Sequence, residues 1–394
     1  MKIALPKFNI EYLLSTYLVV LFGLDILNKF ELFEELPWSI FVKFGKFAFF
    51  FIFLWILIKY TKNQTKHVLI LLTCFFVISS SIPLLTNFSI ENLKAISPNI
   101  RLFTLYLFPL IFSGFLLNFK DEKYPLLEKI YIGIIIIVSI SVLIGFVTEF
   151  RFLKTYVTRF GFVGLMPKSI TASYFFISSI IFTYYLGFIK QKSKWIFALV
   201  FLTSFLVGTK AIYLFNLLLI GFHAFYFKWY KSYYFYGLGL ISLIGIFMFQ
   251  NKIIEFLWTY FTSFMKLYEA KGLVTALTSF RDLIFINNKD LYLEKWNWWN
   301  YLIGGKIPNA KLFESSIWDL IVFFGVIGVC LYVYVLSENI FKFYSKSNYF
   351  SNFSIFSVFL ISILAGQFFI NISGISYFLI TLFLIRSSNK VKSI

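Results

Sequence analysis

The chain has 394 residues, of which 60% are hydrophobic and 14% are charged, and its mean hydropathy is +0.83. These values exclude a soluble globular protein and are typical of a polytopic membrane protein. The formal net charge of +18 would suggest a nucleic-acid partner for a soluble protein. In a membrane protein it indicates cytoplasmic loops that meet anionic lipid, so we expect membrane lipid as a partner and no nucleic acid.

The cysteines and histidines do not form a pattern. Cys74 and Cys330 both lie in apolar runs, and His67 and His223 are far apart in the sequence. No disulfide framework or metal site follows from these positions, and we expect no cofactor. The first apolar run has no small-residue cleavage site after it, so we predict a retained membrane span and no cleaved signal peptide.

Apolar runs long enough to cross a bilayer recur along the chain. They lie at residues 11–28, 37–58, 67–86, 102–119, 129–148, 169–189, 195–228, 233–250, 316–336 and 352–386. Two of them are too long for one span, and each contains a turn signal, Gly208-Thr-Lys210 or Asn371-Ile-Ser-Gly374, so each is predicted to form two short helices. We therefore expect an all-α fold of about twelve transmembrane helices, or eleven or ten if a pair is re-entrant, in one integral membrane domain over residues 1–394.

Positive charge alternates between the predicted loops. With the N-terminus inside, the internal segments carry most of the lysines, for example Lys190, Lys192 and Lys194, and the first external loop is acidic. This asymmetry predicts that both termini are cytoplasmic and that the polar stretch 251–315 is a large external loop.

The stretch 251–315 contains further helical signals. Residues 252–271 carry polar side chains on one stripe and aromatic and aliphatic ones elsewhere, which predicts an amphipathic helix along the membrane surface. A second helical piece follows with Arg281 and Asp282. The cluster Trp296-Asn-Trp298-Trp299 is typical of an interfacial aromatic belt, and the alternative is a platform on which sugar rings stack.

One external segment departs from the charge rule. Residues 149–168 contain Arg151, Lys154, Arg159 and Lys168 against a single glutamate. Such positive charge outside the membrane fits either an anion site for a phosphorylated lipid or sugar, or an ordinary solvated loop.

Several charged residues fall within or beside the predicted spans, all toward the external side. Ionisable groups at such depth tend to face a polar cavity, so a shared outward-opening cavity is one interpretation. The alternative for the two lysines of the second span is that they extend to the lipid headgroups. The residues concerned are Asp25, Lys43, Lys46, Lys210 and Asp319.

Three short patterns occur in a fixed order in the second half of the chain. They are Arg159-Phe-Gly161…Met166-Pro167-Lys168…Ala172, then Gly208-Thr209-Lys210-Ala211, then Ser279-Phe-Arg281 followed by Gly304-Gly305, Glu314, Asp319, Gly325 and Gly328. This order around one large external loop resembles the O-antigen polymerase and O-antigen ligase superfamily over about residues 150–386.

The resemblance implies a membrane-glycosyltransferase (GT-C-like) architecture in the bacterial inner membrane. It implies a polyprenyl-diphosphate-linked oligosaccharide as the substrate, a site that faces the periplasm and no metal. It also allows a chain-length regulator as a further partner. Ligases of this superfamily usually carry a histidine about eleven residues before the helix glycine. Glu314 stands at that position here, ahead of Gly325. This departure favours a polymerase, and the alternatives are a ligase and a lipid-linked oligosaccharide flippase.

Expected roles follow from the chemistry of the transfer. Cleavage of the bond between an anomeric carbon and a diphosphate expels an anion, so cations near its oxygens would stabilise the transition state. We expect Glu314 as the base that accepts the proton of the acceptor hydroxyl, with Arg281 as the catalytic cation; the alternative for Glu314 is a charge favoured by a helix N-terminus. The residues expected to bind the diphosphate or glycan are Arg159, Lys168, Lys210 and Asp319.

Overall fold

The computed structural model of the chain describes residues 10–34, 39–60, 64–86, 90–119, 122–155, 160–260, 262–306, 313–342 and 349–389. Within these residues the fold is helical, and strand-like pairing is limited to an antiparallel bridge between Lys154 and Phe162. The helices before the polar stretch are α1 Ile10–Glu34, α2 Ser39–Tyr60, α3 Gln64–Thr86, α4 Ile90–Leu116, α5 Pro125–Thr148, α6 Ser169–Tyr184, α7 Trp195–Phe205, α8 Lys210–Tyr226 and α9 Tyr233–Met248. Those that follow are α10 Gln250–Tyr260, α11 Thr262–Thr278, α12 Arg281–Lys295, α13 Trp298–Ile303, α14 Ser316–Lys342, α15 Tyr349–Ala365 and α16 Ile372–Asn389.

Each predicted apolar run coincides with a helix, and both long runs are divided in two. The first divides between α7 and α8, where Gly208 has a φ of +73°. The second divides between α15 and α16 at residues 366–371, so Asn371 lies at the end of the break, directly before α16. Among the described residues, six helices are long and apolar enough to cross a membrane: α1, α2, α4, α5, α6 with the π-helical turn Tyr185–Ile189, and α14. These helices indicate a membrane protein.

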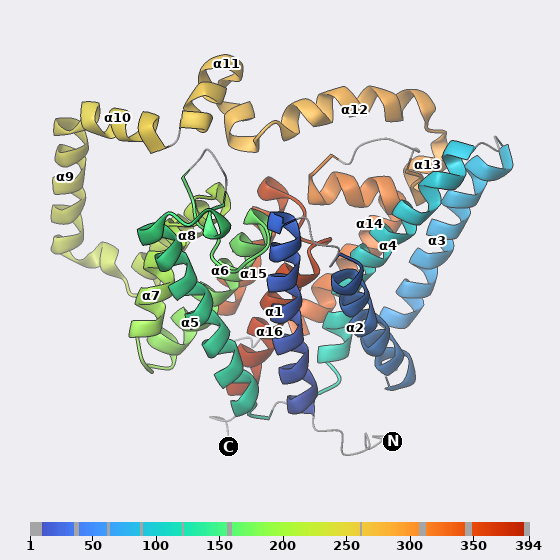
Figure 1. The fold of residues 1–394 in the computed structure, drawn as a ribbon, viewed down its shortest axis with the longest axis horizontal. Helices are drawn as coiled ribbons and strands as arrows, with labels where there is room; N and C mark the ends of the chain where they lie inside the picture. Colours follow the sequence, from blue (N-terminus) through green and yellow to red (C-terminus); the bar gives the residue numbers. More distant parts are fainter. Residues whose placement is uncertain are drawn as a thin grey trace.

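The polar stretch lies across one end of the helical bundle. Figure 1 shows α10, α11 and α12 running over that end, while α1 begins and α16 finishes at the opposite end. Residues 252–271, predicted as one amphipathic helix, contain most of α10 and the first part of α11, and residue 261 lies outside the described residues. Figure 1 also shows α9 standing apart from α7 and α8. The side chains of α9 that the structure describes are mostly exposed, for example Tyr233 to 93% and Phe247 to 77%.

The core of the bundle is formed by α6 and α16, which pack side by side. Every residue of α6 from Thr171 to Tyr184 is buried. The approach is close because Gly374 of α16 faces α6, where an added Cβ would lie 3.0 Å from the Cβ of Tyr174. Buried hydroxyls satisfy one another across the core, as between Tyr131 and Thr381 at 3.0 Å. The interior thus contains many small polar residues, a composition suited to helices that associate within lipid.

α14 is interrupted at Gly325, where the backbone has φ 63° and ψ −177°. A Cβ at Gly325 would collide with the backbone of Leu302 at the end of α13. The turn after α13, at Gly304 and Gly305, packs equally closely on α14. A Cβ at Gly304 would meet the backbone of Phe323, and the N–H of Gly305 donates to the carbonyl of Val322 at 2.9 Å. The end of the polar stretch is therefore docked, backbone against backbone, into the break in α14.

Candidate functional site

The corner between α11 and α12 carries Arg281. Two residues other than glycine, Ser279 and Phe280, adopt the left-handed backbone conformation there, with φ angles of 56° and 70°. Asp282, in the first turn of α12, accepts hydrogen bonds from the hydroxyls of Thr275 at 2.5 Å and Thr278 at 2.8 Å. Burial by itself would raise the pKa of Asp282, but these bonds and bonds from the backbone lower it below its ordinary value. The ionised aspartate thus fixes the corner from which Arg281 projects.

Lys210 joins the start of α8 to the same corner. Its ammonium donates to the carbonyl of Ala276 and to the hydroxyl of Ser279 at 2.9 Å, and lies 5.0 Å from the centre of the Phe264 ring. The second and third sequence patterns, around Lys210 and Arg281, are therefore in direct contact.

The first pattern contacts the second. The N–H of Phe162 donates to the carbonyl of Leu206 at 2.8 Å, and a Cβ at Gly208 would lie 2.8 Å from the Cα of Gly161. Lys168 is exposed and stands immediately before α6. Arg159 lies outside the described residues.

The backbone carbonyl of Glu314 and the side chain of Arg281 both lie beside Gly366, in the break between α15 and α16. Gly366 has a φ of +67°, and a Cβ there would collide with the carbonyl of Glu314 and lie 3.5 Å from the Nε atom of Arg281. Gly366 is held from the other side, since its carbonyl accepts the hydroxyl of Tyr174 of α6 at 2.8 Å. The Arg281 guanidinium donates through one terminal nitrogen to the carbonyl of Thr278 at 3.2 Å. Its Nε is buried and has no hydrogen-bond partner among the described residues.

Asp319 lies behind this group. It is 1% exposed, and its carboxylate accepts the N–H of Phe313 at 2.7 Å, which holds the residue before Glu314 against the first turns of α14. Arg281 and Glu314 are both close enough to act on it electrostatically. Substrate binding by Asp319 stays a prediction; in this structure its buried carboxylate holds Phe313, the residue before Glu314.

Aromatic rings hold α12 over the start of α14. Phe285, Tyr292 and Phe313 form ring contacts with centroids 5.5 Å apart. Trp296 packs on Tyr292 and donates through its indole N–H to the carbonyl of Gly305 at 2.8 Å. Trp296 is thus part of the packing of the loop. Trp298 is 75% exposed, which fits either an interfacial aromatic belt or a platform for sugar rings.

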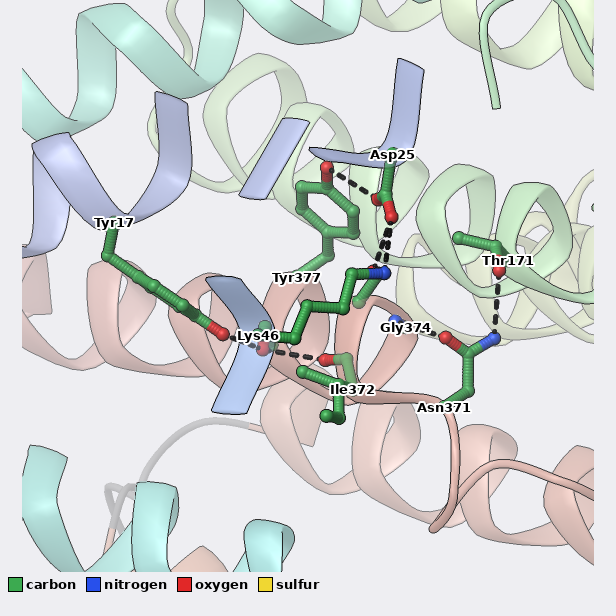
Figure 2. A network of polar contacts seen from close by, with 10 residues as sticks. Tyr17, Asp25, Lys46, Thr171, Asn371, Ile372, Gly374 and Tyr377 are labelled. Atoms are coloured by element: carbon green, nitrogen blue, oxygen red, sulfur yellow. Dashed lines mark hydrogen bonds and ion pairs between the residues drawn. The ribbon is translucent and has the colours of Figure 1, made fainter. Parts of the chain in front are cut away.

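A second charged cluster lies where α1, α2 and α16 meet (Figure 2). Asp25 is fully buried and pairs with Lys46 at 2.8 Å. The Ser373 hydroxyl donates to the same carboxylate oxygen of Asp25 at 2.7 Å, the Lys46 ammonium reaches Ser373 at 3.0 Å, and the Tyr377 hydroxyl lies 3.5 Å from the other oxygen. Extension to the headgroups is therefore wrong for Lys46, whereas Lys43 is exposed. Ser373 belongs to the predicted turn signal Asn371-Ile-Ser-Gly374 and lies in the first turn of α16, but its pairing with Asp25 has no signature in the sequence.

Of the expected site residues, Lys210, Arg281, Glu314 and Asp319 lie at one end of the bundle. Among the described residues, no group of three or more His, Cys, Asp or Glu side chains is arranged to hold a metal ion. Comparisons with protein-family models, with curated proteins and with solved structures find no match.

Proposed function

We propose that the chain is a membrane glycosyltransferase, specifically a polymerase of O-antigen or a similar surface polysaccharide. It would transfer a polyprenyl-diphosphate-linked glycan onto the non-reducing end of another lipid-linked repeat unit. The observation that carries the proposal is that Arg281 and the backbone of Glu314 both lie beside Gly366, with Lys210 bound to the same corner of the loop. Both Arg281 and Glu314 also act electrostatically on Asp319. Cations for a diphosphate and a carboxylate for a hydroxyl proton are the groups that this transfer needs.

In this proposal the acceptor hydroxyl oxygen attacks the anomeric carbon of the donor sugar. The bond from that carbon to the diphosphate oxygen breaks, and polyprenyl diphosphate leaves with the electron pair. Arg281 donates hydrogen bonds to the oxygens that gain charge, and its buried Nε is a donor that the described residues leave unpaired. Glu314 takes the hydroxyl proton, and attack from the face opposite the leaving group inverts the anomeric centre.

We also propose that the shorter apolar helices lie in the membrane with the six long ones, giving about twelve spans of GT-C-like architecture in the bacterial inner membrane. Supporting this, lysines such as Lys190 and Lys192 lie in the predicted internal loops. In addition, α1 begins and α16 finishes at one end of the bundle, and α10–α12 lie over the other end (Figure 1). This arrangement is consistent with termini on one side of the membrane and the loop on the other. Both termini are then cytoplasmic and the loop periplasmic.

The topology is tested by a cysteine in the loop. In a variant without Cys74 and Cys330, Asn287→Cys on the exposed side of α12 should react with a membrane-impermeant thiol reagent in intact spheroplasts. A control cysteine at Gln191, in the loop between α6 and α7, should react only after the membrane is opened. The reverse result would overturn the proposed site.

The activity is tested by supplying the purified protein in liposomes with lipid-linked repeat units. A ladder of lipid-linked chains that differ by one repeat is the expected product. Transfer to a lipid A–core acceptor without a ladder would instead identify a ligase. Movement of the lipid-linked unit across the bilayer without a new glycosidic bond would identify a flippase.

A further inference from the structure

The buried Asp25–Lys46 pair contacts the start of α16, and its position there needs an explanation. Two charges removed from water add little net stability, because their attraction roughly offsets the cost of desolvating them. The pair is nevertheless complete: Asp25 is fully buried, the Lys46 side chain is 16% exposed, and Ser373 bonds to both. Such a pair is better explained by the geometry that it fixes than by the energy that it adds.

What the pair contacts is the first turn of α16. Ser373 is the second residue of that helix, and the residue before the helix, Asn371, caps it by accepting the N–H of Gly374 at 3.0 Å. The Asn371 amide also donates to the hydroxyl of Thr171 at 3.2 Å, in the first turn of α6. Figure 2 shows this cap beside the ion pair, so the start of α16 is held by α1, α2 and α6 together.

The backbone that leads into this anchored turn is the break at residues 366–371, and its other end forms part of the proposed site. Gly366 packs on the carbonyl of Glu314 and beside the Nε of Arg281, and Tyr174 holds its carbonyl. Six residues therefore connect the ion pair to the two groups assigned to catalysis.

We propose that Asp25, Lys46 and Ser373 are positioning residues. By fixing the depth and rotation of the start of α16, they hold the 366–371 segment against which Arg281 and Glu314 are aligned. The effect on catalysis rests on the proposed function, whereas the effect on the segment does not.

The first test measures the segment directly. In a variant without Cys74 and Cys330, Gln367→Cys places a half-buried probe beside Gly366. The double substitution Asp25→Leu with Lys46→Met removes the pair without leaving a single buried charge, so the thermal midpoint should stay near that of the parent. The rate at which the probe reacts with an impermeant thiol reagent should rise about tenfold, the change in an opening equilibrium that accompanies loss of a hydrogen bond to a charged group.

Ser373→Ala keeps the ion pair but removes the shorter of its two hydrogen bonds from α16, leaving the longer one from Tyr377. It removes only one hydroxyl, so folding is retained. It should raise the reactivity of the probe in the same direction by less. The matched control is Asn339→Leu, which removes a buried polar group that bonds to Ser113 at 3.1 Å and to Thr65 at 3.5 Å, between α14, α4 and α3. This control should leave the probe's reactivity unchanged.

The second test is kinetic. In the polymerisation assay the double variant should lose turnover (kcat) about tenfold with little change in KM, because the groups that meet only in the transition state are misaligned. Unchanged probe reactivity in both the double variant and Ser373→Ala would overturn the inference, as would an equal rise in Asn339→Leu. If the probe responds but the parent makes no polymer, the positioning role stands and the proposed function fails.

Discussion

The two charged clusters of this protein differ in how completely the chain satisfies them. Around Asp25 and Lys46, every charge has a partner within the chain, and both carboxylate oxygens of Asp25 accept hydrogen bonds. At the end of the bundle covered by α10–α12, the buried Nε of Arg281 has no partner among the described residues. Buried donors are nearly always bonded, because leaving one unpaired costs about 1–3 kcal/mol. The Asp25–Lys46 cluster is therefore satisfied within the described residues, whereas beside Glu314 the described residues leave the buried Nε of Arg281 without a partner.

The largest effect is expected from removing the unsatisfied donor. Arg281→Ala should remain inserted and folded but extend chains about 100–1,000-fold more slowly, the loss that follows removal of one hydrogen-bond donor to a transition state. Arg281→Lys should restore only part of the rate, because an ammonium lacks the planar fork of the guanidinium. Rates of chain extension in liposomes measure this, with Lys289→Ala, on the exposed side of α12, as the control. Near-normal polymer from Arg281→Ala would mean that the unpaired donor has no catalytic purpose.

A slightly smaller effect is expected at the carboxylate of Glu314. Glu314→Gln keeps the size of the side chain but removes its basicity, so we expect extension to slow at least about 100-fold while the lipid-linked donor still binds. Binding and single-turnover rates separate the two steps. Glu294→Gln, exposed on α12, is the matched control. If turnover is intact and only the thermal midpoint falls, Glu314 is a structural charge beside α14 and the base lies elsewhere.

The docking of the loop should be sensitive to a single methyl group. Gly325→Ala places a Cβ into the backbone of Leu302 at a φ of 63°, and strain of this kind costs about 1–3 kcal/mol. We expect a lower thermal midpoint and a loop that is cut more quickly by protease. Gly221→Ala, in α8, is the control because its Cβ would meet nothing within 4 Å. Equal behaviour of the two variants would show that the loop is not held at this break.

The smallest effect is a pH-dependent one at the corner of α11 and α12. The pKa of Asp282 is lower in the folded protein than its ordinary value, so its ionised form stabilises the corner above about pH 4, and this stabilisation is lost as the pH falls through the lowered pKa. Asp282→Asn should therefore lower the thermal midpoint modestly at neutral pH, with the difference from the parent disappearing in acid. Asp290→Asn, exposed on the same helix, should show no such trend. A difference that persists in acid would assign the effect to lost packing.

The sequence predicted the helices well because hydrocarbon-length apolar runs allow little else in lipid. It also predicted that the patterns around Lys210 and Arg281 belong together, and the two are in contact. It could not predict the break at Gly325, because glycine is common within membrane helices and its φ is set by the loop that docks there. The pairing of Asp25 with Lys46 was equally hidden, since it depends on how two helices are rotated about their axes.

The position of α9 has a consequence for the surrounding bilayer. The helix has 16 residues, and at about 1.5 Å of rise per residue it is roughly 24 Å long, against a hydrocarbon thickness of about 30 Å. Because α9 stands apart from the bundle (Figure 1), no neighbouring helix compensates for the difference. If α9 crosses the membrane as proposed, lipid must thin around it, and hydrophobic mismatch would favour thinner bilayers. Reconstitution into lipids of graded acyl length would then tilt or displace α9, and with it the attached arm α10–α12 above the bundle.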